Sequence, residues 1–281
     1  MTLFLRDDLA TAWHGDDPFE RAAHQEGLVF RAREGRRTLR FEAGGKPYFL
    51  KYHAGIGWGE VVKNLTQAKW PILGAMSEVR AIRAVAAAGI DTLSIAGYGQ
   101  RGLNPARRES FLVTDELVDT ISLEELGESW NGTPPPFAFK SALVRRVGEI
   151  AKAMHDAGVN HRDFYLGHFL MPKRDVADGR INGPLHLIDL HRSQVRARVP
   201  RRWRVKDLGG LYFSTARVPL TRRDLLRFVK AYTGMPLREA LDDKSPLLGA
   251  SRREGEKIYR RYFETEPDFP LPFQEHPGKD I

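Results

Sequence analysis

Two carboxylates in polar surroundings are the first residues that could do chemistry. Asp163 lies in VNHRDFYLGHFLMP, residues 159–172, which sets two histidines, an arginine and an aspartate among apolar residues. Asp189 closes the run PLHLIDL, which predicts a short strand ending in a carboxylate. Two carboxylates delivered to one place can divide the labour, one meeting a substrate proton and one holding a cation. A polar loop whose acids and Arg162 satisfy one another accounts equally well for these residues taken alone.

A lysine and a glutamate form a second pair of interest. Lys51 lies in YFLKY, one of two or three short strands predicted over residues 27–53, where the turns REGRR and EAGGKP separate β-branched and aromatic runs. Glu78 lies in SEVRAIRAVAAAGI, which predicts a helix with Ser77 as its N-cap. Taken alone, Lys51 is typical of a strand lysine that faces water, and Glu78 of a surface acid favoured by the helix dipole.

The remaining elements must position these four residues. Apolar runs predict strands over 94–102 and 109–117, and the helical period predicts an amphipathic helix over 139–159 that leads directly to the HRD tripeptide. Further helices are predicted from Asp207, over 220–234 and over 251–266, and the proline-rich end is predicted to be extended. The long connection 54–74 is typical of a lid or a substrate-contacting loop, and a junction between two lobes is predicted near 115–119.

Composition excludes several classes of protein. The chain of 281 residues has no cysteine, which excludes disulfides, thiolate nucleophiles and cysteine zinc sites and favours a reducing compartment. The acidic N-terminal segment does not resemble a signal peptide, and no run approaches the roughly 18 apolar residues of a spanning helix. The net charge of +8, with seven Lys and Arg residues between Arg192 and Lys206, indicates acidic partners such as phosphate or an anionic surface.

The order of the four residues is more specific than any one of them. Lys51 on a strand, Glu78 in the next helix, HRD at 161–163 and Asp189 at a strand end follow the order found in protein-kinase-like phosphotransferases. In that scheme Lys51 orients the nucleotide phosphates and is held by Glu78. Asp163 accepts the proton of the acceptor hydroxyl or orients that hydroxyl, and Asp189 holds Mg²⁺.

Longer motifs extend this resemblance. The segments YFLKYH, SEVRAIRAVAAAGI, FLVTDEL, HRDFYLGHFL, LIDLHR and KDLGGLYFS resemble the lipopolysaccharide core heptose(I) kinase family over most of residues 27–215. The resemblance implies an α+β, two-lobed protein-kinase-like fold. The N-lobe, residues 1–116, would be an antiparallel sheet with one main helix, and the C-lobe, residues 117–281, would be mainly helical.

The same resemblance implies a function and its partners. It implies ATP- and Mg²⁺-dependent phosphorylation of heptose I of the lipopolysaccharide inner core in Gram-negative bacteria, by an enzyme bound peripherally to the cytoplasmic face of the inner membrane. Asp115 and Leu117 would contact the nucleotide. The partners would be the core glycolipid, the anionic membrane surface and an acidic protein, without nucleic acid.

Three departures from the general kinase pattern define further expectations. His168 stands where the catalytic loop has a metal-binding asparagine, so we expect it beside Asp189 at the metal, although Mg²⁺ prefers oxygen ligands. The usual DFG reads Asp189-Leu190-His191, which removes the glycine hinge. No GxGxxG precedes Lys51, and we expect Arg36 and Arg37 to contribute to nucleotide binding in its place.

Four alternatives remain open at this point. A kinase acting on 3-deoxy-octulosonic acid or on protein tyrosine would carry similar motifs. A catalytically inactive, kinase-shaped module that binds anionic glycolipid is supported by His168. A metal-dependent phosphoesterase using His161, Asp163, Asp189 and His191 would leave Lys51 and Glu78 without a role.

Overall fold

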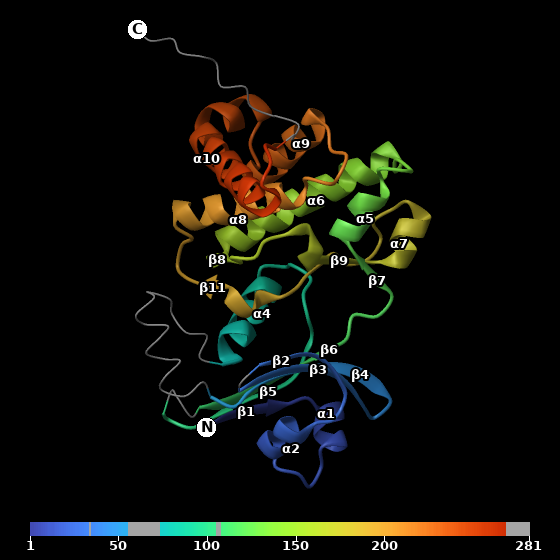
Figure 1. Cartoon of the computed structure of the whole chain (residues 1–281), viewed down its shortest axis with the longest axis vertical. Coiled ribbons are helices and arrows are strands. Elements are labelled where there is room, and N and C mark those ends of the chain that lie inside the picture. The colour runs from blue at the N-terminus through green and yellow to red at the C-terminus, as the bar shows by residue number, and fades with distance from the viewer. Residues whose placement is uncertain (34, 56–73, 105–107, 268–281) are drawn as a thin grey trace. The chain divides into compact units, whose positions relative to one another are not determined.

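A computed structural model describes residues 1–33, 35–55, 74–104 and 108–267 (Figure 1). It combines helices with antiparallel sheets, as the α+β expectation requires. The described chain forms two compact units. The first contains Met1–Arg83, Thr92–Val118 and Leu190–Ser193; the second contains Ala84–Asp91, Asp119–Asp189 and the described chain from Gln194.

The first unit is built on a six-stranded antiparallel sheet in the order β1-β5-β6-β4-β3-β2. Its strands are β1 Thr2–Leu5, β2 Leu28–Arg33, β3 Arg36–Ala43, β4 Lys46–His53, β5 Ile95–Arg101 and β6 Glu109–Asp115. Alternation along β4 buries Tyr48, Leu50 and Tyr52 on one face and turns Lys51 to the other.

Two N-terminal helices cover the buried face of this sheet. They are α1 Asp7–Ala12 and α2 Pro18–His24, and their Leu9 and Phe19 pack with Leu50 in one core. Asp17 caps α2 by accepting hydrogen bonds from the amides of the second and third residues after it, at 2.7 and 3.2 Å. No helix was predicted in this acidic N-terminal segment, because these helices are too short to display an apolar period.

Helix α4, Met76–Ala87, follows the gap at 56–73. The prediction that Ser77 caps this helix is wrong, because Ser77 lies inside it and its hydroxyl donates to the Gly74 carbonyl at 3.3 Å. Residues 56–73 of the predicted lid, residues 268–281 of the proline-rich end and residue 34 of the REGRR turn lie outside the described residues.

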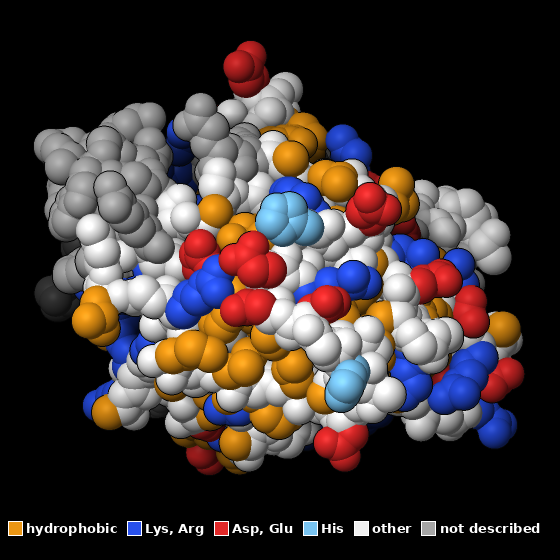
Figure 2. Space-filling view, turned by 90° about the horizontal axis from the view of Figure 1, so that it is seen from below, with side chains coloured by type: hydrophobic (Ala, Val, Ile, Leu, Met, Phe, Trp, Pro, Cys, Tyr) orange, Lys and Arg blue, Asp and Glu red, His pale blue; other side chains and the backbone are white. Residues whose placement is uncertain are grey.

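Several charged side chains of the first unit form ion pairs with more than one partner. Arg6 bonds both Asp8 and Asp115, at 2.8 and 2.6 Å. Arg101 bonds both Glu20 and Glu109, at 2.7 and 2.6 Å. Figure 2 shows this pattern, with Lys and Arg side chains lying beside Asp and Glu on the face that it presents.

The second unit is mainly helical. Its helices are α5 Leu123–Ser129, α6 Phe137–Asp156, α7 Lys173–Asp178, α8 Arg201–Ser214, α9 Arg222–Thr233 and α10 Leu237–Phe263. Its short strands are β7 Thr120–Ser122, β8 Val159–Asn160, β9 Phe169–Pro172, β10 His186–Leu187 and β11 Gln194–Val195, and single 3-10 turns lie at Leu166–His168 and Leu190–Arg192. Strand order is β10-β9-β7 in one sheet and β11-β8 in another.

Three element boundaries in or beside this unit differ from expectation. Helix α8 begins at Arg201 rather than Asp207, so part of the basic run is helical, with Pro200 supplying the extended residue before it. Helix α10 is continuous over 27 residues and contains Pro246, where only a helix over 251–266 was expected. The strand predicted to end at Asp189 is reduced to His186–Leu187. Among the described helices, none has the length and apolar character needed to cross a membrane.

Candidate active site

Lys51 and Glu78 form an ion pair within the first unit. The Lys51 ammonium lies 2.6 Å from Glu78 Oε1, and the exposed fractions of the two side chains are 25% and 3%. A carboxylate as buried as that of Glu78 requires a charged partner, and α4 supplies it to the sheet face that α1 and α2 leave uncovered. Lys51 is therefore more than a strand lysine that faces water, and Glu78 is not a surface acid.

The two candidate arginines point to opposite faces of the sheet. Register pairs Arg36 with His53 and Thr38 with Lys51, which sets Arg36 on the face that carries Lys51. Arg37 pairs with Tyr52 on the core face, and its guanidinium donates to the Gln25 carbonyl. The structure therefore brings Arg36, but not Arg37, to the sheet face of Lys51.

His53 shares this face and is unusually placed for a histidine. Its Nδ1 is buried and makes no hydrogen bond to any residue that the structure describes. Burial, followed by the nearby charges of Arg36 and Lys51, lowers the pKa of His53 from 6.5 to about 4. The imidazole is therefore neutral around pH 7.

Asp115 and Leu117 end the sheet and begin the connector to the second unit. The Asp115 carboxylate is held by Arg6 at 2.6 and 2.9 Å. Its amide donates to the Ser94 carbonyl at 3.0 Å. The carboxylate and the amide of Asp115 are thus both committed to contacts within the first unit.

In the second unit, a buried carboxylate organises the HRD tripeptide. Asp207 is 0% exposed and accepts hydrogen bonds from the amides of His161 and Arg162, at 2.8 and 2.7 Å. Its Oδ2 also lies 3.2 Å from Nε2 of the buried His155. The Arg162 backbone has φ of 76°, a left-handed conformation that costs a non-glycine residue free energy. Asp207 thus holds the loop in a shape it would not adopt alone.

Sequence reasoning assigned no role to Asp207 or His155. Asp207 lies in KDLGGLYFS, where an acid opens an apolar helical run, and that is the one signal that could have identified it. His155 lies on the otherwise apolar stripe of α6. Both are positioning residues, since they act through the loop.

His161 is a buried positioning residue as well. Its Nε2 donates to the Ile188 carbonyl at 2.9 Å, and its Nδ1 accepts from the Asp163 amide at 3.3 Å. Burial is the first cause that lowers the pKa of His161. A neutral ring with one donor and one acceptor matches these two bonds, through which His161 holds the loop.

His168 and Asp189 come together beside Asp163. The His168 Nδ1 lies 2.6 Å from the Asp163 carbonyl oxygen, so it carries the proton of this hydrogen bond. The other nitrogen, Nε2, lies 3.6 Å from Asp189 Oδ2. A lone pair that faces a carboxylate can be bridged to it by a bound cation. Asp189 has φ of 59°, a second left-handed residue at this place.

The donor set is incomplete as a metal centre. Within the part of the chain that the structure describes, no group of three or more His, Cys, Asp or Glu side chains is arranged to hold a metal ion. Asp189 supplies the oxygen ligand that Mg²⁺ prefers, and a nucleotide's phosphate oxygens and water would have to supply others. The residues therefore fit a metal bound together with a nucleotide.

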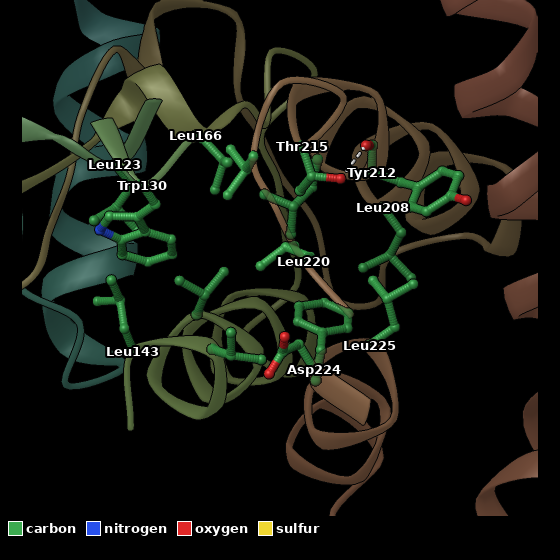
Figure 3. Close-up of a pocket in the computed structure, with 15 residues that line it drawn as sticks. Leu123, Trp130, Leu143, Leu166, Leu208, Tyr212, Thr215, Leu220, Asp224 and Leu225 are labelled. Carbon is green, nitrogen blue, oxygen red and sulfur yellow. Dashed lines mark hydrogen bonds between the residues drawn. The ribbon is translucent and has the colours of Figure 1, made fainter. Parts of the chain in front are cut away.

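The second unit also contains an apolar cavity of about 100 Å³ (Figure 3). Its one carboxylate, Asp224, bonds Thr221 and Lys140 at 2.8 and 3.0 Å. The cavity therefore offers no uncommitted charge for phosphoryl transfer. Figure 3 shows these residues around it: Leu123, Trp130, Leu143, Leu166, Leu208, Tyr212, Thr215, Leu220, Asp224 and Leu225.

The profile of the lipopolysaccharide kinase (Kdo/WaaP) family matches residues 20–232. The chain belongs to this family. It is 49% identical over 261 residues to the lipopolysaccharide core heptose(I) kinase WaaP of Pseudomonas aeruginosa, covering 93% of this chain and 97% of that protein. It is 46% identical over 259 residues to the WaaP of Escherichia coli K12, covering 92% and 97%.

A solved structure gives the same result. WaaP in complex with acyl carrier protein superposes with a TM-score of 0.77 at 43% identity, covering 92% of this chain and all of that one, 100%. The family resemblance seen in the sequence is confirmed. The roles of the individual site residues remain predictions.

Proposed function

We propose that this protein is an ATP-dependent kinase that phosphorylates heptose I of the lipopolysaccharide inner core. Identity of 44 to 49% to three heptose(I) kinases, over more than nine-tenths of the chain, supports this acceptor. The single observation that carries the chemistry is the 2.6 Å ion pair of Lys51 with the buried Glu78. A phosphoesterase would have no use for that pair, which is how kinases hold a lysine toward nucleotide phosphates.

The architecture in this proposal is a two-lobed protein-kinase-like fold. Residues 1–116 form the N-lobe and residues 117–281 the C-lobe. The six-stranded antiparallel sheet with α4, and the mainly helical second unit, support this division.

Each site residue then has a distinct task. Lys51 orients the phosphates, Arg36 adds a positive charge on the same sheet face, and the backbone at Asp115 and Leu117 meets the nucleotide. Asp163 accepts or orients the proton of the acceptor hydroxyl while that oxygen forms a bond to phosphorus and the bond to the departing diphosphate breaks. ATP supplies the phosphoryl group, and Mg²⁺ neutralises its charge. Positioning and charge neutralisation supply most of the rate.

Asp189 holds the metal in this proposal, with His168 beside it. The hydrogen bond from His168 Nδ1 to the Asp163 carbonyl directs the Nε2 lone pair toward Asp189. An outer hydrogen bond of this kind fixes the orientation of a metal-bound histidine. His168 can therefore serve in place of the usual asparagine.

Replacement of Asp163 by asparagine tests the proposal. Because the loss of a general base typically costs a factor of about 10² to 10⁴, we expect transfer of phosphate to purified heptose-containing core acceptor to fall by at least about a hundredfold. Asp178→Asn, an exposed acid at the end of α7, is the matched control and should keep full activity.

The acceptor is tested separately with a panel. Wild-type protein is compared on core glycolipid with heptose, on glycolipid ending in 3-deoxy-octulosonic acid, and on tyrosine peptides. Faster transfer to either of the last two acceptors would show that heptose is not the preferred acceptor. No transfer to any of them by folded wild-type protein would favour the inactive, glycolipid-binding alternative.

The proposal includes two partners besides the acceptor. The solved WaaP is described in complex with acyl carrier protein, which supports an acidic protein partner for this basic chain. The basic residues from 192 to 206 would be drawn to the anionic cytoplasmic face of the inner membrane, where the enzyme would bind peripherally.

A further inference from the structure

Four cationic side chains of the second unit surround one indole. Measured to the centroid of the Trp203 ring, Arg162 lies at 5.3 Å, Arg196 at 5.6 Å, Arg202 at 5.5 Å and Lys206 at 5.3 Å. We call these five residues the Trp203 cluster. Because all four charges lie within 5.6 Å of the same ring centroid, any two of them are separated by at most twice that distance. At such separations like charges repel one another.

Hydrogen bonds fix two of the four cations, Arg196 and Arg162, in place. The Arg196 guanidinium donates to Asn160 Oδ1 at 2.7 Å and to Gln194 Oε1 at 2.6 Å. Both acceptors are neutral, so they orient this charge without cancelling it. Arg162 is only partly exposed, and its left-handed backbone is fixed by the bond from its amide to Asp207.

Three of the four cations, Arg196, Arg202 and Lys206, are not neutralised by a described acid. Asp207 is fully buried and committed to backbone amides and His155. Among the residues that the structure describes, no carboxylate pairs with Arg196, Arg202 or Lys206. The first turn of α8 contains no acid and has no side-chain cap, which adds the positive end of the helix dipole.

A hydrogen-bond donor inside the cluster also lacks an acceptor. The indole Nε1 of Trp203 is buried and makes no hydrogen bond to the described residues. Buried polar groups normally find partners, and an unsatisfied donor among four cations calls for an acceptor with negative charge. This observation is independent of the charge count.

We propose that the Trp203 cluster binds an oxyanion of the acceptor, a carboxylate or a phosphate, on a group neighbouring the sugar that is phosphorylated. The inference rests on the proposed function and deepens it. Arg162 directly precedes Asp163 in the chain. An anion held at the cluster therefore anchors the acceptor beside the residue that meets its hydroxyl. A guanidinium can donate two parallel hydrogen bonds to two oxygens of either kind of oxyanion.

The geometry favours a discrete ion over a membrane surface. A leaflet attracts flexible, exposed charges by summed electrostatics. Here Arg196 and Arg162 are partly buried and oriented by fixed hydrogen bonds, which is the pre-organisation that a single bound group exploits. Of the four cations of the cluster, only Arg202 and Lys206 are exposed.

The double variant Arg202→Gln/Lys206→Gln tests the cluster without disturbing the loop. Steady-state kinetics with purified core glycolipid should show KM for the acceptor raised about tenfold, as expected for the loss of charge-assisted contacts. The KM for ATP and kcat should stay within about twofold. Arg222→Gln/Arg223→Gln removes the same charge from two exposed residues at the start of α9 and should leave every constant unchanged.

Modified acceptors identify the anion. The comparison is repeated with dephosphorylated acceptor and with acceptor whose carboxylates have been reduced to alcohols. The modification that abolishes the difference between wild type and double variant names the group bound. If the difference in acceptor KM between wild type and double variant survives both modifications, the proposal is overturned. It is also overturned, in favour of membrane docking, if the KM of the double variant rises only with acceptor in anionic vesicles and not with delipidated soluble acceptor.

Binding without ATP separates this proposal from the proposed function. Titration of wild-type protein with core glycolipid should change tryptophan fluorescence, and Trp203→Phe should remove most of that change. If wild type binds glycolipid in this way yet transfers no phosphate to heptose, the proposed function fails and the cluster proposal stands. If wild type transfers phosphate while the double variant matches it in binding and KM, the cluster proposal alone fails.

Discussion

Arg36 and Arg37 are neighbours whose side chains leave β3 on opposite faces. The first shares its face with Lys51, and the second is tied to the Gln25 carbonyl beside the core. The sequence assigned both to the nucleotide, since a pair of arginines in a turn gives no indication of which one faces the site. Strand alternation supplies that indication.

Substitution of the two arginines should therefore have different effects. Arg36→Ala should raise the KM for ATP by about fivefold through the loss of a charge near the phosphates. Arg37→Ala should leave that KM unchanged and lower the free energy of unfolding by about 1 kcal/mol through the lost bond to Gln25. Equal KM values for wild type and Arg36→Ala would remove Arg36 from the nucleotide site.

The lowered pKa of His53 makes the stability of the folded chain depend on pH. Its pKa is about 4 in the folded chain and 6.5 in its ordinary state, so the unfolded chain binds more protons between these values. The stabilisation is complete above pH 6.5 and is lost as pH falls toward 4, by about 3 kcal/mol in total. Urea titrations of wild type at pH 7 and pH 5 measure part of this loss.

Two variants isolate the contribution of His53. His53→Phe should flatten the dependence of unfolding free energy on pH, because no group remains there to be protonated. His24→Gln removes an exposed histidine from the same unit and should follow wild type. A His53→Phe protein with the pH dependence of wild type would show that another group is responsible.

At the scale of secondary structure, the paired strands β8 and β11 lead into and constrain the active-site loop. Gly158 precedes β8 with φ of 76°, and a Cβ on it would overlap the Arg196 carbonyl oxygen. The same two strands carry Asn160 and Gln194, which orient the Arg196 guanidinium. Only glycine permits this approach.

Gly158→Ala should consequently destabilise the protein and weaken its catalysis. We expect a loss of about 3 kcal/mol in unfolding free energy, of which the left-handed conformation accounts for about 1 kcal/mol. Gly89→Ala is the matched control, because Gly89 has φ of 73° with no atom near its missing Cβ. Thermal or urea unfolding measures both; losses of equal size would show that the carbonyl contact does not matter.

The elements that the sequence predicted well are those with their own period. Strands β3 and β4 and helices α6 and α9 display alternation or an apolar stripe. The start of α8 was missed because Arg201–Lys206 has no apolar period. Its helix is stabilised by packing on α10, where a Cβ on Gly209 would lie 2.8 Å from Glu254 Cβ. Such tertiary contacts cannot be seen in a local pattern.

The site was predicted to the extent that its residues lie in motifs. Lys51, Glu78, Asp163 and Asp189 were named from their order, and the Lys51–Glu78 contact agrees with the scheme. The role of Asp207 could not be predicted, because it depends on the fold bringing a carboxylate to two amides 45 and 46 residues away. The unmatched charge around Trp203 likewise depends on where the strands and α8 place their basic residues.

For the molecule as a whole, the excess of positive charge is the property most relevant to its partners. The net charge is +8 over the full chain. In the first unit, Arg6 and Arg101 are each paired with more than one acid, whereas three cations of the Trp203 cluster have no carboxylate partner among the described residues. Attraction to anionic partners should therefore come mainly from the basic residues of the second unit, the Trp203 cluster holding an oxyanion of the acceptor and the other basic residues drawing the protein to a membrane surface.

Sedimentation with lipid vesicles checks this expectation. The protein should sediment with vesicles rich in anionic lipid and remain in solution with neutral ones, at about 1 kcal/mol of attraction for each basic residue near the surface. Raising the salt to about 1 M shortens the screening length to about 3 Å and should release the protein. Equal binding to neutral vesicles, or binding that resists salt, would indicate a hydrophobic attachment instead.

The carboxylate of Asp207 also makes the active-site loop visible to hydrogen exchange. The amides of His161 and Arg162 lie in a loop, where exchange with solvent is ordinarily fast, yet both donate to a fully buried acceptor. Their deuterium uptake should be as slow as that of a core strand. The exchange of these two backbone protons thus reports whether the loop is ordered, in any variant and without substrate. It distinguishes a variant that has lost activity with an ordered loop from one whose loop has opened.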